Sequence, residues 1–177
     1  MSKKFLYSPL SLKNIEENGL FSGYASVFNV VDKQNDLILP GAFKENLNRS
    51  KIKLLWQHDP SDPIGNILDI YENDVGLYIT AHLLLGVQKA KEAYLMLKAG
   101  TIDGLSIGYI PIKHDIDHET GARILKQVEL WEISLVTFPA NSAAQVINVK
   151  HQNNEQEMLV RAIEKANNVL ANTYISP

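Results

Sequence analysis

Cysteine is absent from this sequence of 177 residues, and its absence excludes three kinds of chemistry together. The chain has no disulfide, no thiol nucleophile and no thiolate ligand for a metal. No apolar run is long enough to cross a bilayer, and the first nine residues lack the apolar core of a signal peptide. We therefore expect a soluble protein of a reducing compartment, without a membrane partner.

Basic residues are also not in excess, since 17 Lys and Arg stand against 20 Asp and Glu, for a net charge of −3. They are scattered and form no basic stripe, so no nucleic-acid partner is expected. The chain is long enough to bury a core. We predict one β-rich domain over residues 1–150. A C-terminal helix within residues 151–177 would then pack on that domain or on a neighbour.

Short segments of alternating apolar residues dominate the first 150 positions. They predict strands over residues 21–28, 51–57, 64–70, 76–85, 104–112 and 123–138. Helical patterns cover residues 88–98 and, briefly, 40–47, whereas the proline-bounded residues 59–63 are typical of a loop. One long internal helix among many short strands favours an α+β, mainly β fold: a closed or nearly closed antiparallel β-barrel with peripheral helices.

A single carboxylate, Glu132, interrupts the apolar run of residues 130–138. An ionised carboxylate in a buried strand is costly unless it has a partner. Strand alternation places Glu132 and Ser134 on one face, and Trp131 and Ile133 on the other. The function of the chain therefore depends on which residue Glu132 contacts on its own face of the strand.

Two more polar residues lie at strand positions. His58 ends a predicted strand, and Ser106 lies near Gly108, whose missing side chain permits a close approach by a substrate backbone or another loop. A serine hydroxyl needs a base to act as a nucleophile, and histidine is such a base near pH 7. A carboxylate behind the histidine fixes its tautomer. Together these residues have the composition of a hydrolytic triad, although each alone has an ordinary structural explanation.

Other acids compete for the role of Glu132. Asp59 is adjacent to His58, but neighbours on a strand point to opposite faces. Asp103 is close to Ser106, within a predicted turn.

Metal chemistry is the other alternative for this chain. His114 and His118, with the aspartates between them, have the composition of a metal site. A solvated hairpin tip explains them better. Asp32 and Asp36 lack the ligand spacing of a calcium loop. We expect neither a cofactor nor a metal.

Several blocks of sequence, taken in order, carry a family resemblance. They are GYASVF at 23–28, Asp36 with PGAF at 40–43, LWQHD at 55–59, PIG at 63–65, GLSIGY at 104–109 and EISLVTFPAN at 132–141. In this order and spacing they resemble the prohead (head-maturation) serine protease family of tailed bacteriophages. The resemblance covers about residues 20–149.

The resemblance implies a fold similar to the herpesvirus maturation proteases. It also implies His58 as general base, Ser106 as nucleophile and Glu132 as the orienting acid, with the backbone N–H groups of Ala140 and Asn141 as oxyanion donors. The implied function is that of a serine endopeptidase inside the phage procapsid, in the host bacterial cytoplasm. Its partners would be the major capsid protein, whose scaffolding segment it cleaves, and a second copy of itself. The alternative is a non-catalytic capsid-assembly module.

Overall fold

The computed structural model describes residues 18–45 and 47–149. Within them the chain forms eight strands and one helix. In chain order these are β1 (Leu20–Val27), β2 (Asp36–Ile38), β3 (Lys53–Trp56), β4 (Asp59–Glu72), β5 (Gly76–Leu83), α1 (Gln88–Lys98), β6 (Gly104–Ile116), β7 (Arg123–Val136) and β8 (Val146–Val149). The helix predicted within residues 151–177 lies outside the described residues. No helix of the described part is long and apolar enough to cross a membrane.

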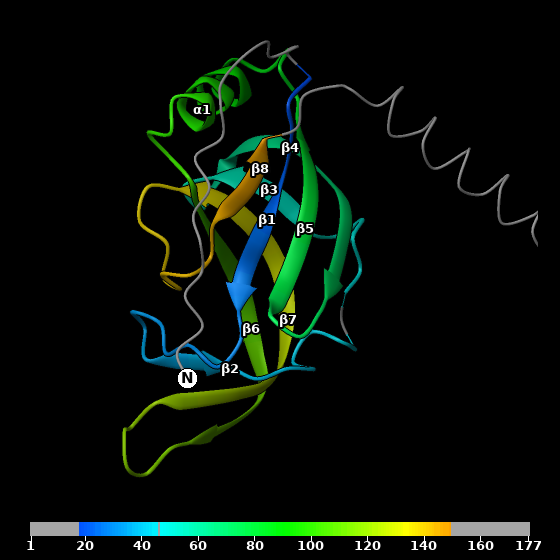
Figure 1. The fold of residues 1–177 in the computed structure, drawn as a ribbon. Coiled ribbons are helices and arrows are strands. Elements are labelled where there is room, and N and C mark those ends of the chain that lie inside the picture. The colour runs from blue at the N-terminus through cyan, green and yellow to red at the C-terminus, as the bar shows by residue number, and fades with distance from the viewer. Residues whose placement is uncertain (1–17, 46, 150–177) are drawn as a thin grey trace, which may run out of the picture. The chain divides into compact units, whose positions relative to one another are not determined.

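The strands form one curled sheet in the order β2-β7-β3-β4-β5-β1-β8, and β6 pairs with β7 (Figure 1). The prediction of a mainly β fold with a helix is confirmed. The sheet is mixed rather than antiparallel throughout, because β2 and β3 both run parallel to β7.

The curled sheet is a half-barrel. Strand β6 on one side and the segment that leads into β8 on the other meet through isolated contacts. The start of β6 reaches residues 144–146 through one bridge, Gly104 to Gln145. The Leu105 N–H donates to the Ala144 carbonyl at 3.0 Å, next to this bridge. The described residues form no continuous ladder between β6 and β8.

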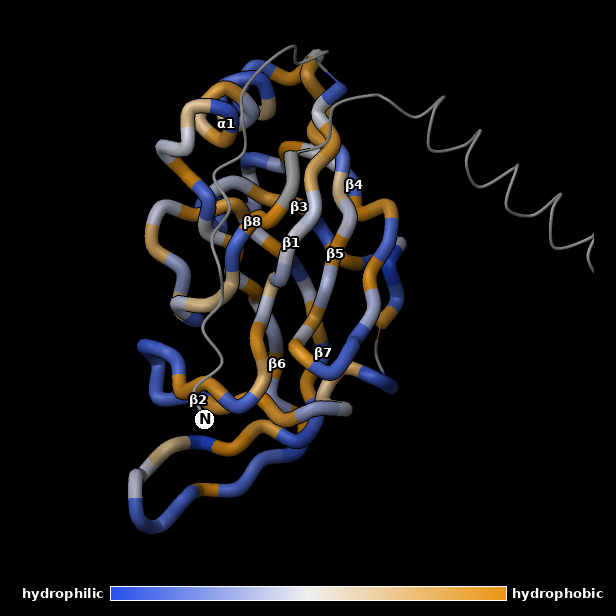
Figure 2. The backbone as a smooth tube through the Cα atoms, in the orientation of Figure 1, coloured by the Kyte–Doolittle hydropathy of each residue, from blue (hydrophilic) through white to orange (hydrophobic). Residues whose placement is uncertain are grey.

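The helix α1 has the predicted bounds. Its apolar residues recur at helical spacing, and Ala90, Ala93, Tyr94 and Leu97 are buried. Gly100 follows the helix with φ +67°, the left-handed conformation that ends many helices. In Figure 1, α1 lies at one end of the sheet, and the β6–β7 hairpin extends at the other. Figure 2 shows hydrophobic residues along the central strands and mainly hydrophilic ones at the hairpin tip.

Two local predictions are wrong. Residues 40–45 form successive turns instead of a short helix. Gly41 has φ +93°, which is not helical, and the Glu72 carboxylate accepts the N–H groups of Gly41 and Phe43 at 3.0 and 2.8 Å. The apolar pattern there reflects Phe43, which is fully buried in this turn.

Residues 59–63, predicted as a loop, begin strand β4. Trp56 pairs with Asp59 and Leu55 with Pro63, and the register between these pairs is irregular. Proline lacks an N–H and is tolerated in sheets at such irregularities. The long β4 therefore folds back on β3 directly after a two-residue turn.

Strand β7 contains a bulge at Trp131. Gly108 pairs with Glu132, but the next residue, Tyr109, pairs with Leu130. The extra residue on β7 shifts the alternation, so Leu130 is buried and Trp131 is 58% exposed. The prediction that Trp131 and Ile133 lie on the same face is therefore wrong, since Ile133 is fully buried.

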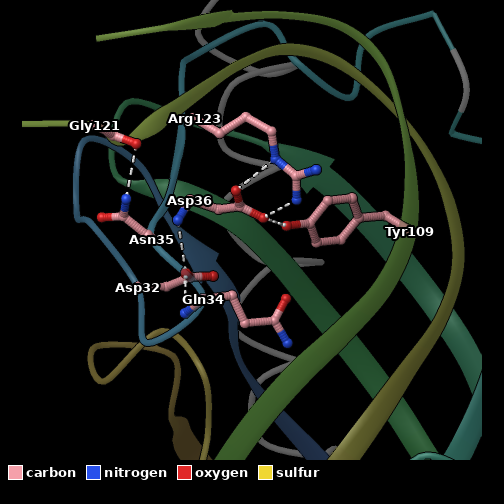
Figure 3. A network of polar contacts seen from close by, with 7 residues as sticks. All are labelled: Asp32, Gln34, Asn35, Asp36, Tyr109, Gly121 and Arg123. Carbon is pink, nitrogen blue, oxygen red and sulfur yellow. Dashed lines mark hydrogen bonds and ion pairs between the residues drawn. The ribbon is translucent and has the colours of Figure 1, made fainter. Parts of the chain in front are cut away.

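The short strand β2 is attached to β7 by an ion pair between the buried Asp36 and the partly exposed Arg123 (Figure 3). Asp36, 1% exposed, accepts hydrogen bonds from Arg123 Nε at 2.7 Å and Nη2 at 2.6 Å. The Tyr109 hydroxyl donates to the same carboxylate at 2.5 Å. Burial acts to raise the pKa of Asp36, but the hydrogen bonds from Arg123 and Tyr109 outweigh it and lower that pKa. The pair therefore stabilises the fold above the ordinary pKa of aspartate, and this contribution is lost as the pH falls through the lowered value.

We expect Arg123→Ala to destabilise the protein by about 2 kcal/mol, because it leaves the buried Asp36 carboxylate without its cation, bound only by the Tyr109 hydroxyl. Chemical denaturation measures the free energy of unfolding. Lys126→Ala is the matched control, since it removes an exposed ion pair with Asp115 on the same hairpin and should change stability by less than about 1 kcal/mol. Equal losses in the two variants would contradict the expected role of the Asp36–Arg123 pair.

Candidate active site

Strand β7 carries Glu132 and Ser134 between two neighbouring strands. On one edge, β3 runs parallel, with Lys53 opposite Glu132 and Leu55 opposite Ser134. On the other edge, β6 runs antiparallel, with Ser106 opposite Ser134 and Gly108 opposite Glu132. Side chains of paired residues lie on the same face of a sheet. The register thus places Ser106, Ser134 and Glu132 on one face.

Gly108 leaves room for the carboxylate of Glu132. A Cβ atom at this position would lie 2.3 Å from Oε1 and 3.0 Å from Cδ of Glu132. The space beside this glycine, expected to admit a substrate backbone or another loop, is therefore occupied by the Glu132 side chain, which crosses over β6.

A tight hairpin between β3 and β4 carries His58. Its two central residues, Gln57 and His58, have φ +52° and +63°, as in a type I′ turn, which normally has Asn-Gly at this place. The Gln57 N–H donates to the Leu135 carbonyl at 2.9 Å, and the His58 N–H donates to Ser134 Oγ at 3.0 Å. These bonds attach the turn to β7.

The side chain of His58 meets Glu132. His58 Nδ1 lies 2.7 Å from Glu132 Oε1, with the imidazole 45% and the carboxylate side chain 14% exposed. The Ser134 hydroxyl donates to the other carboxylate oxygen, Oε2, at 2.6 Å. The hydrogen bond with Glu132 raises the pKa of His58; burial opposes this, and the negative charge of Glu132 adds to it. The carboxylate accepts from Nδ1–H, which leaves Nε2 of the neutral ring as a proton acceptor.

Ser106 lies one strand away from this pair, on the same face, and is 6% exposed. No hydrogen bond joins Ser106 to His58 within the described residues. In hydrolases the contact between nucleophile and base often tightens only when the substrate binds. The structure therefore brings His58 and Glu132 together and places Ser106 nearby.

A small cavity of about 10 Å³ lies beside Ser106. Its lining includes Ala140 and Asn141. The Asn141 side chain donates to the Val27 carbonyl at 2.8 Å, and the Ala140 carbonyl accepts from the Lys33 N–H at 3.1 Å. These bonds hold the turn, whereas the N–H groups of Ala140 and Asn141 donate to no described residue.

Neither competing acid takes the place of Glu132 beside His58. The Asp59 carboxylate accepts the Ser61 N–H at 2.8 Å. Asp103 lies just before β6, where its backbone carbonyl accepts the Val146 N–H at 2.8 Å. Asp117, at the tip of the β6–β7 hairpin, accepts hydrogen bonds from Glu119 and Thr120. His118 thus lies at the predicted hairpin tip, whereas His114 lies within β6 and pairs with Leu125. In the described part of the chain no three potential ligands gather as a metal site would require.

Ser134 is a site residue to which sequence reasoning assigned no role. Its signal is its position two residues after Glu132, which puts both on one face. Gly108 was expected to permit a close approach, but the identity of the approaching group had no signal in the sequence, because it depends on the pairing of β6 with β7.

The fold matches solved structures of viral proteases. It is similar to the KSHV protease in complex with a hexapeptide phosphonate inhibitor, with a TM-score of 0.53 and 12% identity over 82% of this chain and 76% of that one. It is also similar to the capsid assembly protease of bacteriophage T4, with a TM-score of 0.52 and 16% identity over 72% of this chain and 88% of that one. At these identities the likeness defines the class of fold.

The family model of the caudovirus prohead serine proteases matches residues 8–159, and the chain belongs to this family. It is 37% identical over 138 residues to the prohead protease of Enterobacteria phage HK97, covering 76% of this chain and 61% of that protein. It is 31% identical over 158 residues to the capsid polyprotein of Pseudomonas phage PAJU2, covering 85% of this chain and 23% of that protein. The chain thus spans less than two thirds of the length of these relatives.

We expect Gly108→Ala to separate Glu132 from His58 while the fold persists. The new Cβ would meet only the flexible Glu132 side chain among its nearest atoms, so the carboxylate must move and the pKa of His58 should fall toward its ordinary value of about 6.5. An NMR titration of the His58 ring measures this pKa, and thermal unfolding measures the stability. Gly86→Ala is the control, because a Cβ there meets nothing within 4 Å. An unchanged titration of His58 in Gly108→Ala would contradict the expectation.

Proposed function

We propose that this chain is a serine endopeptidase in which Ser106 is the nucleophile, His58 the general base and Glu132 the acid that orients His58. The observation that supports this best is the 2.7 Å contact between His58 Nδ1 and Glu132 Oε1, on the sheet face that also carries Ser106. Membership of the prohead serine protease family supports the same chemistry.

In the proposed reaction, Ser106 Oγ attacks the carbonyl carbon of a peptide bond as His58 Nε2 takes its proton. Glu132 stabilises the imidazolium that results. The N–H groups of Ala140 and Asn141 donate to the oxyanion of the tetrahedral intermediate. His58 then gives its proton to the leaving amine as the C–N bond breaks. Water hydrolyses the acyl-enzyme with His58 again as base.

We propose that the substrates are the scaffolding segment of the major capsid protein and the protease itself, cleaved inside the procapsid in the bacterial cytoplasm. The likeness to a protein named capsid polyprotein supports a capsid substrate. Cleavage of one copy by another requires self-association, and a dimer is the form we propose. A nearly closed barrel is proposed as well, supported by the contacts between the start of β6 and residues 144–146.

A non-catalytic capsid-assembly module is the second candidate. It is favoured by the low exposure of Ser106 and by the lack of a hydrogen bond from Ser106 to His58 among the described residues. On this alternative, the polar network around Glu132 only stabilises the sheet.

We expect co-expression with the capsid protein to give a truncated capsid protein with the wild type and a full-length one with Ser106→Ala, because the variant lacks the nucleophile. Intact-mass analysis of both chains measures the cleavage and locates its site. Full-length masses in both cases, in proheads that assemble, would establish the assembly module. Truncation in both would assign cleavage to another residue or to a host protease.

We expect kcat/KM to rise with pH through an apparent pKa above about 6.5, because the base must be neutral and Glu132 raises the pKa of His58. Glu132→Gln should lower both this midpoint and the rate. The measurement is the pH profile of cleavage of a peptide that spans the mapped site. Glu129→Gln, the same change at an exposed position of β7, should keep the wild-type profile; a shared shift would show a general effect of charge.

A further inference from the structure

We infer that Ser134 is a positioning residue of the proposed triad: its hydroxyl connects Glu132 to the backbone of His58 in one closed ring of hydrogen bonds. This inference rests on the proposed function, because it assigns Ser134 a part in the same reaction.

The ring has three hydrogen bonds. The Ser134 hydroxyl donates to Glu132 Oε2 at 2.6 Å and accepts from the His58 N–H at 3.0 Å. The third is the contact of 2.7 Å between His58 Nδ1 and Glu132 Oε1. Both carboxylate oxygens are thus engaged, and rotation of the carboxylate would break two bonds. Since Ser134 is completely buried, water does not readily replace its hydroxyl.

The backbone of His58 also depends on this contact. Gln57 and His58 both have left-handed conformations, which are unfavourable for residues other than glycine. The bond from the His58 N–H to Ser134 helps to hold this turn on β7. Loss of the hydroxyl would therefore release the imidazole and its acid together.

The geometry distinguishes Ser134 from a nucleophile. Its hydroxyl proton is directed to Glu132, on the acid side of the imidazole, and not to Nε2. Ser106, on the paired strand β6, borders the small cavity together with Ala140 and Asn141. Ser134 thus acts through Glu132 and His58.

The test is an NMR titration of the His58 ring in the full chain with Ser106→Ala, so that autoproteolysis is absent. Glu132 is the charged group that raises the pKa of His58, and burial opposes it. Ser134→Ala should lower this pKa toward the value found with Glu132→Gln, whereas Ser134→Thr, which keeps the hydroxyl, should retain it. Ser22→Ala is the control, because it removes another buried hydroxyl. Ser22 lies in β1, where its hydroxyl accepts a hydrogen bond from the Tyr78 hydroxyl of β5.

Activity provides the second measurement, with Ser106 intact. Ser134→Ala should lower kcat on the order of tenfold with little change in KM, because a misplaced base slows the chemical step. Ser134→Thr should recover most of the rate. If Ser134→Ala does not fold, Ser134→Cys takes its place, since a thiol has similar size and donates weakly.

A folded Ser134→Ala or Ser134→Cys variant with the parental titration of His58 and the wild-type rate would overturn the inference. A lowered pKa of His58 together with reduced kcat would establish it. If the pKa falls but the wild type cleaves nothing, the hydrogen-bond ring stands and the proposed protease function fails.

Discussion

Strand β7 is paired on both edges where the candidate site lies, and this pairing determines which strand residues meet in the site. Residues 132–135 face β3 on one side and β6 on the other. A shift of one residue in either pairing would turn the side chains to the opposite face. The register therefore brings Glu132 opposite Gly108, and Ser106 opposite Ser134.

Two acidic residues, Asp36 on β2 and Glu132 on β7, have partners of different kinds. Asp36 is almost fully buried and is bound by Arg123, whose charge is permanent. Glu132 is bound by His58, a half-exposed group that gains and loses a proton near neutral pH. The first arrangement stabilises the fold, and the second is suited to proton transfer. The cavity beside Ser106 is also lined by Asp36, so the stabilising pair supports one wall of the site.

Backbone irregularities complete the site, and these were the features least accessible from sequence. The turn at Gln57 and His58 adopts a conformation that Asn-Gly usually signals, so nothing predicted that β4 would begin at Asp59. The bulge at Trp131 changes which residues of β7 are buried. Both features depend on pairing with another strand, which a local pattern does not contain.

Local patterns sufficed wherever a segment's own periodicity decided its structure. Helix α1 was predicted with correct bounds because its apolar stripe and terminal glycine are local signals. A lone carboxylate in an apolar strand indicated that Glu132 has a partner, because burial of a bare charge is unfavourable. The family resemblance already pairs this carboxylate with His58, and tertiary structure alone decided that Ser134 contacts them both and that Gly108 leaves the space. These contacts join residues up to 76 positions apart, and their geometry arises only when β3, β6 and β7 pair in one register.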